Sequence, residues 1–384
     1  MVRKPLKLAA LALMAGSGAM LFWPKQIAAI ANSSAKLIAR YTAVDEFSKP
    51  KFALEGEALF REQSLPAASI SLSEQKLLKV LVNTRAYFRK FAAEDPVINR
   101  VGVLETQGVT IPKVLETLDF MVQVLKEDMA AGRPARLRDP QFINQNFRVI
   151  RWSPYNPRDR QQTEKLRVTK YAVFIQAGSR QKTATFNTAL YALPESATTD
   201  LFYKQYTKQD VLTGIYEPGG KAAGKVQPLA YLTRAAFEEA LMQGTVLVRF
   251  GGGSSAYFNV DRNNGIAYVR GLEPRDQKRY WYFRPVKAIK GYGNKIQNKI
   301  DIEPSVTFAG DVFNLGLGKI VVLDTGIAGQ KRLILGVVAD TGGAFIPNLY
   351  QLDYLAGLFP NRQTFSQQTG YVPDFVKAYI LVKK

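Results

Sequence analysis

The stretch Leu333–Ala344, which reads Leu-Ile-Leu-Gly-Val-Val-Ala-Asp-Thr-Gly-Gly-Ala, indicates how this chain folds around its chemistry. Its residues Leu333–Ala339 form an almost unbroken apolar run. Such a run predicts a strand that is buried on both faces of a sheet. Asp340 follows where such a strand reaches the surface, so partial desolvation would raise the pKa of its carboxyl group. Gly342 and Gly343 leave the backbone bare there, which permits the close approach of a ligand or another segment.

Downstream, Asp353 lies in the sequence Tyr350-Gln351-Leu352-Asp353-Tyr354, where aromatic side chains flank a carboxylate. Sugar rings stack on aromatic faces such as that of Tyr354, and an aromatic neighbour also lowers the local dielectric. An alternative is that Asp353 is a surface acid on an amphipathic segment. The pattern makes Asp340 and Asp353 the candidates for proton transfer, with Gly342, Gly343 and Tyr354 as candidates for substrate contact.

A second Asp-Thr-Gly triplet, Asp324-Thr325-Gly326, follows the apolar run Lys319–Leu323. An aspartate and a glycine at a strand end are ordinary turn chemistry, and the polar residues 329–332 favour a hairpin there. The two triplets also invite comparison with the carboxylate pair of aspartic proteases. They lie too close in the chain for this, because each should come from its own lobe or subunit.

The composition excludes several classes of enzyme. The chain has 384 residues, 47% of them hydrophobic, and contains neither histidine nor cysteine. Ser-His-Asp and Cys-His nucleophile systems are therefore excluded, as are metal sites with His or Cys ligands. Proton transfer would have to rely on carboxylates, Lys or Tyr. We expect no metal and no cofactor.

The net charge of +20 favours acidic partners, which include nucleic acid, anionic lipid and the anionic polymers of a cell wall. Basic residues at the N-terminus precede the uncharged stretch Leu8–Trp23, a pattern typical of a secretory signal over residues 1–31. An uncleaved anchor is the alternative, and it would associate the protein with a membrane. Either form predicts export to the periplasm or cell envelope, which argues against a nucleic-acid partner. Without cysteine the chain cannot be a bacterial lipoprotein.

Two helices are expected within a helical region at 70–148. The first would start at a capping box, Ser71-Leu72-Ser73-Glu74, and carries apolar residues at helical spacing. The second has Pro112 in its first turn and ends before Gly132. Residues 30–70 show no strong hydrophobic period and are expected to form a connecting segment.

A β-rich region is expected at 149–300. Strands are predicted at Lys165–Ala177 and Thr183–Leu193, joined by a turn, and Thr233 would cap a helix at 234–243. Further strands are predicted at Thr245–Phe250, Ala256–Val260 and Ile266–Val269, the last two joined by the turn Asn263-Asn264-Gly265. Residues 301–384 form the last region. The fold class is thus mainly β with a helical N-terminal layer.

The Gly336–Ala344 stretch, followed by Leu352-Asp353-Tyr354, resembles the three-aspartate C-terminal domain of the membrane-bound lytic transglycosylase A (MltA) family. Upstream, Ile302-Glu303-Pro304-Ser305-Val306 is similar to a second segment of that family, with Glu303 in place of its first aspartate. Leu212-Thr213-Gly214-Ile215-Tyr216-Glu217-Pro218 is similar to a third. The three segments occur in the family's order.

This resemblance implies a double-ψ β-barrel with a second, smaller β-rich domain and a substrate groove. It implies cleavage of the MurNAc–GlcNAc β-1,4 bond of peptidoglycan strands, with formation of 1,6-anhydromuramic acid. Asp353 matches the catalytic aspartate and Asp340 its electrostatic neighbour, while Thr213 and Tyr216 match groove residues. Glu303 would also contact substrate. The alternative is a non-catalytic protein that binds cell-wall glycan on the same barrel.

Overall fold

The computed structural model describes residues 40–384, except for residues 160, 162–163, 270, 327–331 and 343–344. The predicted signal segment 1–31, the polar residues 329–331 and Gly343 therefore lie outside the described residues. Within the described part of the chain, no helix combines the length and the apolar character needed to cross a bilayer.

Six strands close into a barrel. In order around the ring they are β6 (Leu166–Gly178), β15 (Gln351–Phe359), β12 (Thr307–Ala309), β14 (Arg332–Asp340), β13 (Ile320–Asp324) and β16 (Phe375–Lys383). The ring closes because β16 pairs with β13 and also with the start of β6. Residues 333–339 of β14 are all buried, which confirms the prediction made from their apolar run. The double-ψ arrangement of the barrel strands stays a prediction.

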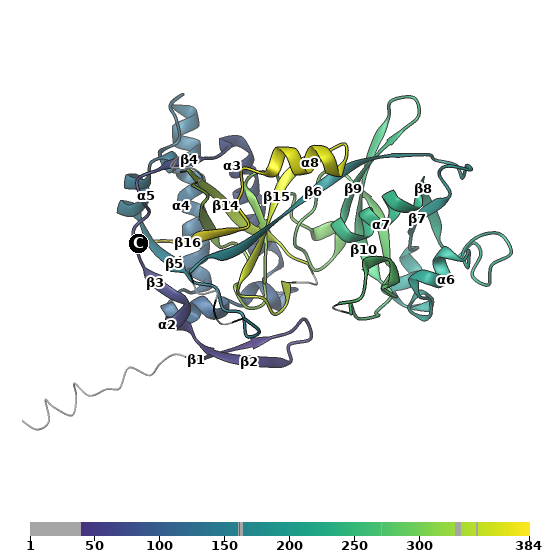
Figure 1. The fold of residues 1–384 in the computed structure, drawn as a ribbon, viewed down its shortest axis with the longest axis horizontal. Helices are drawn as coiled ribbons and strands as arrows, with labels where there is room; N and C mark the ends of the chain where they lie inside the picture. The colour runs from purple at the N-terminus through teal and green to yellow at the C-terminus, as the bar shows by residue number, and fades with distance from the viewer. Residues whose placement is uncertain (1–39, 160, 162–163, 270, 327–331, 343–344) are drawn as a thin grey trace, which may run out of the picture. The chain divides into compact units, whose positions relative to one another are not determined.

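Strand β6 continues out of the barrel into a second sheet. Its residues 175–178 pair in parallel with β9 (Thr245–Phe250), which is followed in the sheet by β10 (Ser255–Asn263) and β11 (Trp281–Val286). Figure 1 shows β6 as a diagonal strand that runs from the barrel to this sheet. A separate hydrophobic core lies here, formed with the hairpin of β7 (Thr188–Ala192) and β8 (Gln227–Leu232). Helices α6 (Lys208–Leu212) and α7 (Arg234–Gln243) complete this part.

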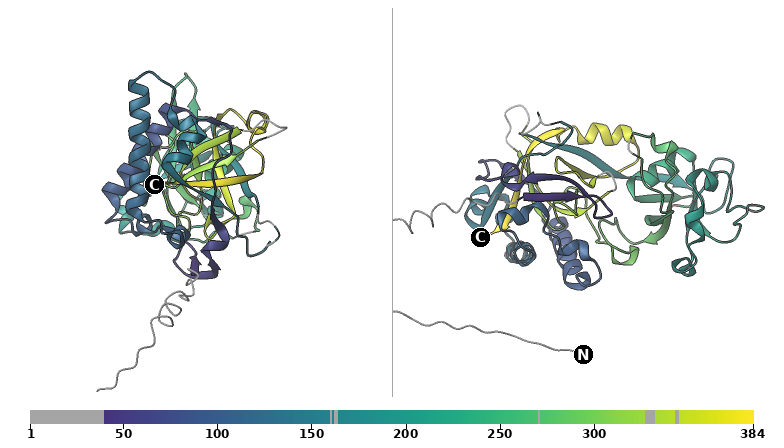
Figure 2. Two further views of the ribbon diagram at one scale, coloured as in Figure 1. Left: turned by 90° about the vertical axis from the view of Figure 1, so that its left-hand side faces the viewer. Right: turned by 90° about the horizontal axis from the view of Figure 1, so that it is seen from below.

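Helices cover one side of the barrel (Figure 2). They are α3 (Glu74–Phe91), α4 (Ile111–Ala130) and α5 (Pro140–Asn146), and the apolar faces of α3 and α4 enter the barrel's core. The hydroxyl of Thr110 caps α4 by accepting from the amide of Lys113 at 3.3 Å, and Pro112 lies in its first turn as predicted. The fold is thus mixed and sheet-rich, with helices over one side of the barrel, which confirms the predicted fold class in part.

The remaining elements extend the barrel sheet or lie at its edge. Strand β5 (Phe147–Trp152) pairs with β16 and with β3 (Phe60–Glu62), and β4 (Ser69–Ser71) pairs with β14. Strands β1 (Arg40–Val44) and β2 (Pro50–Glu55) form a hairpin that precedes α2 (Gly56–Leu59), and α8 (Arg362–Thr369) follows β15. Short 3₁₀ helices lie at Pro96–Asn99, Gly102–Gln107, Arg136–Arg138, Glu195–Thr198, Phe202–Gln205, Pro274–Asp276 and Ile296–Asn298.

Several local predictions are wrong. Helix α3 begins at Glu74 and Ser71 belongs to β4, so the predicted capping box does not form; the Glu74 carboxylate instead accepts from the amide of Ala135 at 3.2 Å. Residues 266–269 are not a strand. The chain pairs β10 instead with β11, which lies farther along the sequence. The predicted connecting segment 30–70 contains β1–β4. Distant partners decide the local structure of Glu74, β3 and β4, whereas β1 and β2 pair with each other in a local hairpin.

Lys319 lies buried directly before β13. Its side chain is 3% exposed, and within the described residues its Nζ has no hydrogen-bond partner. The surrounding side chains include Val109, Val114 and Thr117. Burial lowers the pKa of Lys319 to about 7, so the amine is largely neutral in the folded protein above that pH.

Replacing this amine by a thioether should stabilise the protein. In the unfolded wild-type chain, Lys319 binds a proton once the pH falls below 10.5. In the folded protein it does so only when the pH falls to about 7. Stability is therefore lost as pH falls through that window. We expect Lys319→Met to raise the free energy of unfolding at pH 7 by up to about 4 kcal/mol, and by much less at pH 10.

Urea denaturation at the two pH values measures this difference. The control is Lys377→Met, which removes an exposed lysine from β16 and should leave the free energy of unfolding nearly unchanged. Equal gains at both pH values would show that Lys319 is charged in the folded state.

Candidate active site

The barrel brings Asp340 and Asp353 to the same level of the sheet. Asp340 ends β14 and Asp353 lies near the start of β15, and the short strand β12 runs between them. Ala309 of β12 is the register partner of both aspartates. The two aspartates therefore flank one residue, in the neighbourhood that the family resemblance implied.

Both carboxylate oxygens of Asp340 accept hydrogen bonds. The Tyr171 hydroxyl donates to Oδ2 at 2.6 Å, and the Thr341 amide donates to Oδ1 at 2.8 Å. Burial raises the pKa of Asp340 to about 6, although these hydrogen bonds and the charge of Lys299 act in the opposite direction. Asp340 is thus held mainly as a carboxylate at neutral pH.

Asp353 has a different environment. Burial raises the pKa of its carboxyl group, and Thr169, its register partner on β6, offsets part of the rise, followed by the charges of Arg167 and Lys170. Its Oδ1 is buried, and among the described residues it has no hydrogen-bond partner. The free Oδ1 is the position at which Asp353 can hold a proton, while Thr169, Arg167 and Lys170 favour its ionised form.

Asp340 opens onto a cavity of about 700 Å³. Thr341 and Gly342 line it from the barrel side, while residues of β10, β11 and the segment 290–299 line the rest. Asp353 is not among the lining residues. Basic side chains outnumber acidic ones in this groove; the basic ones are Lys204, Arg262, Arg279, Lys290 and Lys299, and the acidic ones are Glu46, Asp261 and Asp340.

Lys299 is fixed inside the groove wall. Its ammonium group donates to Asn259 Oδ1 at 2.7 Å and to the Val260 carbonyl at 2.8 Å. Burial lowers its pKa to about 8, while the charges of Asp340 and Asp261 oppose this shift. A partly dehydrated cation near Asp340 favours the charged form of that carboxylate.

The other predicted contact residues lie in different places. Gly342 lines the groove, and Gly343 is outside the described residues. Thr213 lines a separate cavity of about 400 Å³, together with Lys182 and Glu217. Glu303 pairs with Lys79 of α3 at 2.5 Å and does not line the groove.

Tyr216 and Tyr354 are core residues. The Tyr216 hydroxyl lies 2.5 Å from that of Tyr282 inside the second core, and Tyr216 is 5% exposed. Tyr354 packs against Phe308, and its hydroxyl lies 3.1 Å from that of Tyr371. Neither side chain lines the groove among the described residues, and their contact with substrate stays a prediction.

Sequence analysis missed Tyr171, Lys299 and Asp311. Asp311 is buried, and its carboxylate accepts from the amide of Asn348 at 2.8 Å and from the side chain of Asn314 at 2.7 Å. It thereby ties the segment before β15 to the loop after β12, and burial raises its pKa to about 7. Tyr171 and Lys299 have no local motif because their partners lie far away in the chain, and the distant partner of Asp311 is Asn348.

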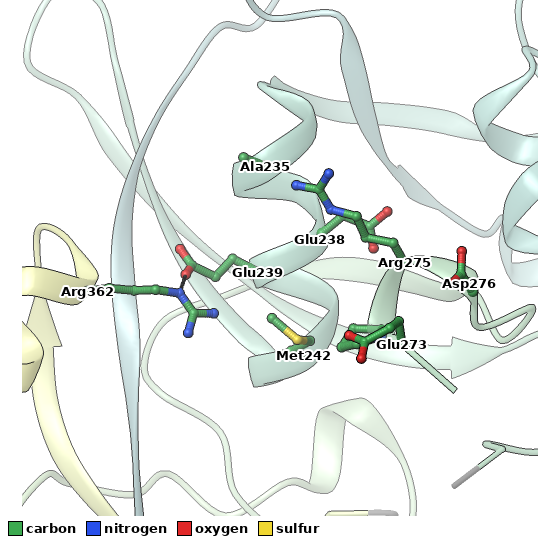
Figure 3. A pocket seen from close by; sticks show the side chains of 9 residues that line it. Ala235, Glu238, Glu239, Met242, Glu273, Arg275, Asp276 and Arg362 are labelled. Carbon is green, nitrogen blue, oxygen red and sulfur yellow. Dashed lines mark hydrogen bonds and ion pairs between the residues drawn. The ribbon is translucent and has the colours of Figure 1, made fainter. Parts of the chain in front are cut away.

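Another cavity, of about 520 Å³, lies beside α7 (Figure 3). Its acidic residues are largely engaged: Glu239 pairs with Arg362 of α8 at 2.5 Å, and Glu238 with Lys208 at 2.8 Å. Neither Asp340 nor Asp353 lines it. We therefore place the candidate site at the groove beside Asp340.

Comparison with known proteins supports the fold. No family model matches the sequence, and no curated protein matches it significantly. The structure is similar to the membrane-bound lytic murein transglycosylase of Agrobacterium tumefaciens, with TM-score 0.57 and 16% identity over 85% of this chain and 98% of that chain. It is also similar to Escherichia coli MltA with bound chitohexaose, with TM-score 0.53 and 16% identity over 85% and 94%.

Neisseria gonorrhoeae MltA matches at TM-score 0.51 and 14% identity, over 84% of this chain and 98% of that chain. These structures cover most of both chains. The chain therefore has the MltA fold, which confirms the resemblance at the level of architecture.

Removal of the Tyr171 hydroxyl should raise the pKa of Asp340. This hydroxyl donates to the charged carboxylate, so Tyr171→Phe takes away one of the groups that lower the pKa, and we expect a value above about 6. NMR titration of carboxyl-labelled aspartate, with the Asp340 signal assigned by its loss in Asp340→Asn, measures the shift. Tyr354→Phe is the control, because its hydroxyl contacts Tyr371. An Asp340 pKa that stays constant or falls in Tyr171→Phe would contradict the assigned hydrogen bond.

Proposed function

We propose that this protein is a peptidoglycan lytic transglycosylase that acts in the cell envelope. It would cleave the MurNAc–GlcNAc β-1,4 bond and leave 1,6-anhydroMurNAc ends. Two features support the proposal. One is the MltA fold, since the structure is similar to that of E. coli MltA with bound chitohexaose, and the other is the pairing of Asp353 with Asp340 across Ala309, with Asp340 lining the groove. The closed ring of six strands fits the double-ψ barrel that the sequence resemblance implies.

In the proposed mechanism, the two aspartates have different roles that follow from their different environments. Protonated Asp353 donates its proton to O4 of the leaving sugar as the C1–O4 bond breaks, and positive charge develops at C1. The same carboxylate, now ionised, accepts the proton of the C6 hydroxyl while O6 forms its bond to C1. Asp353 ends protonated again, so no second carboxylate has to activate water, unlike in ordinary glycosidases.

Asp340 would supply a fixed negative charge beside the reacting sugar. Its two hydrogen bonds and the nearby Lys299 hold it ionised, which suits stabilisation of an oxocarbenium-like centre. In this division of roles Asp353 transfers protons and Asp340 stabilises charge. Burial, rather than repulsion by Asp340, is the leading cause of the raised pKa of Asp353.

The basic groove suits the substrate. MurNAc carries a lactyl group that continues into acidic peptide stems, and a groove rich in Lys and Arg attracts such anions. The observed excess of basic residues at the groove agrees with the net charge of +20 of the whole chain. Peptidoglycan strands are therefore the proposed partner.

Digestion of purified sacculi tests the proposal. We expect the wild type to release 1,6-anhydromuropeptides, identified by mass spectrometry, and Asp353→Asn to lower their rate of release by about 100-fold or more, because general acid–base catalysis typically contributes this much. Asp340→Asn should lower the rate while leaving the products unchanged.

Asp324→Asn is the matched control. Asp324 also ends a buried strand within an Asp-Thr-Gly triplet, but it pairs with Leu333, at the opposite end of β14 from Asp340, so the Asp324→Asn variant should release products at the wild-type rate. Anhydro products that persist in Asp353→Asn would remove this residue from the mechanism. A wild type that binds sacculi without releasing anhydro products would favour the non-catalytic glycan-binding alternative.

A further inference from the structure

A cavity of about 430 Å³ lies between the β1–β2 hairpin and the loop before β11, and its walls are aromatic. Phe47 and Phe52 contribute from the hairpin, Tyr268 from the loop and Tyr350 from the segment before β15. Phe47 is 65% exposed and Tyr268 is 43% exposed. Large apolar side chains left in solvent on the walls of a cavity are typical of a ligand site.

Hydrogen bonds fix the backbone at the tip of the β1–β2 hairpin. Asn314 donates to the Val44 carbonyl at 2.9 Å and accepts from the Val44 amide at 2.8 Å. Within the turn, the carboxylate of Asp45 accepts from the amides of Phe47 at 2.9 Å and Lys49 at 3.0 Å. The exposed position of Phe47 is therefore imposed by its backbone, which makes its ring a preorganised surface.

The same cavity continues toward the groove of Asp340. Glu46 and Ile346 line both spaces. Glu46 also pairs with Arg279 of the groove wall at 3.4 Å, which links the hairpin to the second sheet. An extended ligand that occupies the groove can thus reach the aromatic cavity without leaving the protein surface.

We propose that this cavity, between Phe47 and Tyr268, is an additional glycan-binding subsite that holds sugar residues of the strand beyond the cleaved bond. The proposal rests on the proposed function. Sugar rings present apolar faces that stack on aromatic side chains, and the polar groups Asn156, Arg158 and Lys51 on the same walls can pair with hydroxyls. A peptide stem is the competing occupant.

The test measures affinity against chain length. Isothermal titration calorimetry with chito-oligosaccharides of three to six sugars is performed in the Asp353→Asn background, so that binding is measured without cleavage. We expect affinity to rise with length, and the pair Phe47→Ala and Tyr268→Ala to weaken hexasaccharide binding by about tenfold. Trisaccharide binding should stay unchanged, because the groove alone would hold three sugars.

Two further variants keep the test specific. The single variant Phe47→Tyr preserves the aromatic ring, with Tyr268 left unchanged. It should therefore keep most of the affinity for the hexasaccharide. Phe375→Ala removes an exposed aromatic ring from β16, outside both cavities, and should leave binding unchanged. Because Phe47 is mostly exposed, the alanine variants should fold, which circular dichroism checks.

Equal weakening for short and long oligosaccharides, or none for either, would overturn the subsite. Competition for the cavity by a free stem peptide, with no effect of oligosaccharide length, would assign it to peptide instead. Failure of the proposed function is a separate result: length-dependent binding can persist in a protein that releases no anhydro products from sacculi, and cleavage can occur without the subsite.

Discussion

The arrangement of the site depends on β6, a 13-residue strand that belongs to two sheets. Its first part pairs with β15 and β16 inside the barrel, and its last four residues pair with β9. A strand cannot slip by one residue without turning every side chain to the opposite face. Pairing at both ends therefore fixes where Thr169 meets Asp353 and where Tyr171 reaches Asp340, and it sets the second sheet beside them.

Fixed backbone pairing allows the two carboxylates to have unequal environments. Burial disfavours the charged form of both, and both are partly compensated: Tyr171, Thr341 and Lys299 lower the pKa of Asp340, and Thr169, Arg167 and Lys170 lower that of Asp353. Asp353 is left with a buried oxygen that has no partner among the described residues. The two carboxyl groups therefore differ in their hydrogen bonding: donors engage both oxygens of Asp340, whereas Asp353 keeps one oxygen free to hold a proton.

Local sequence predicted the elements whose stability is local. Helix 234–243 and strand 245–250 were predicted with the bounds found in the structure, because Thr233 caps the helix and Gly244 ends it. The apolar run of β14 and the placement of Asp340 at its end were also predictable. The contacts of Tyr171 with Asp340, of Lys299 with Asn259 and of Asp311 with Asn348 were not, since each joins residues far apart in the chain. The burial of Tyr216 and Tyr354 was not predictable for a related reason: aromatic residues occur in cores as well as in ligand sites, and only packing distinguishes the two.

Asp311 shows that the groove and the aromatic cavity depend on one another. Its carboxylate accepts four hydrogen bonds, from the amides of Phe313, Asn314 and Asn348 and from the side chain of Asn314. Asn348 leads into β15 and Asp353, while Asn314 holds the β1–β2 hairpin at Val44. Burying a carboxylate is costly, and its raised pKa records that cost, which four donors offset. The buried Asp311 carboxyl group thus positions both the strand that carries Asp353 and the hairpin that carries Phe47. The aromatic cavity and the candidate site therefore depend on the same buried group.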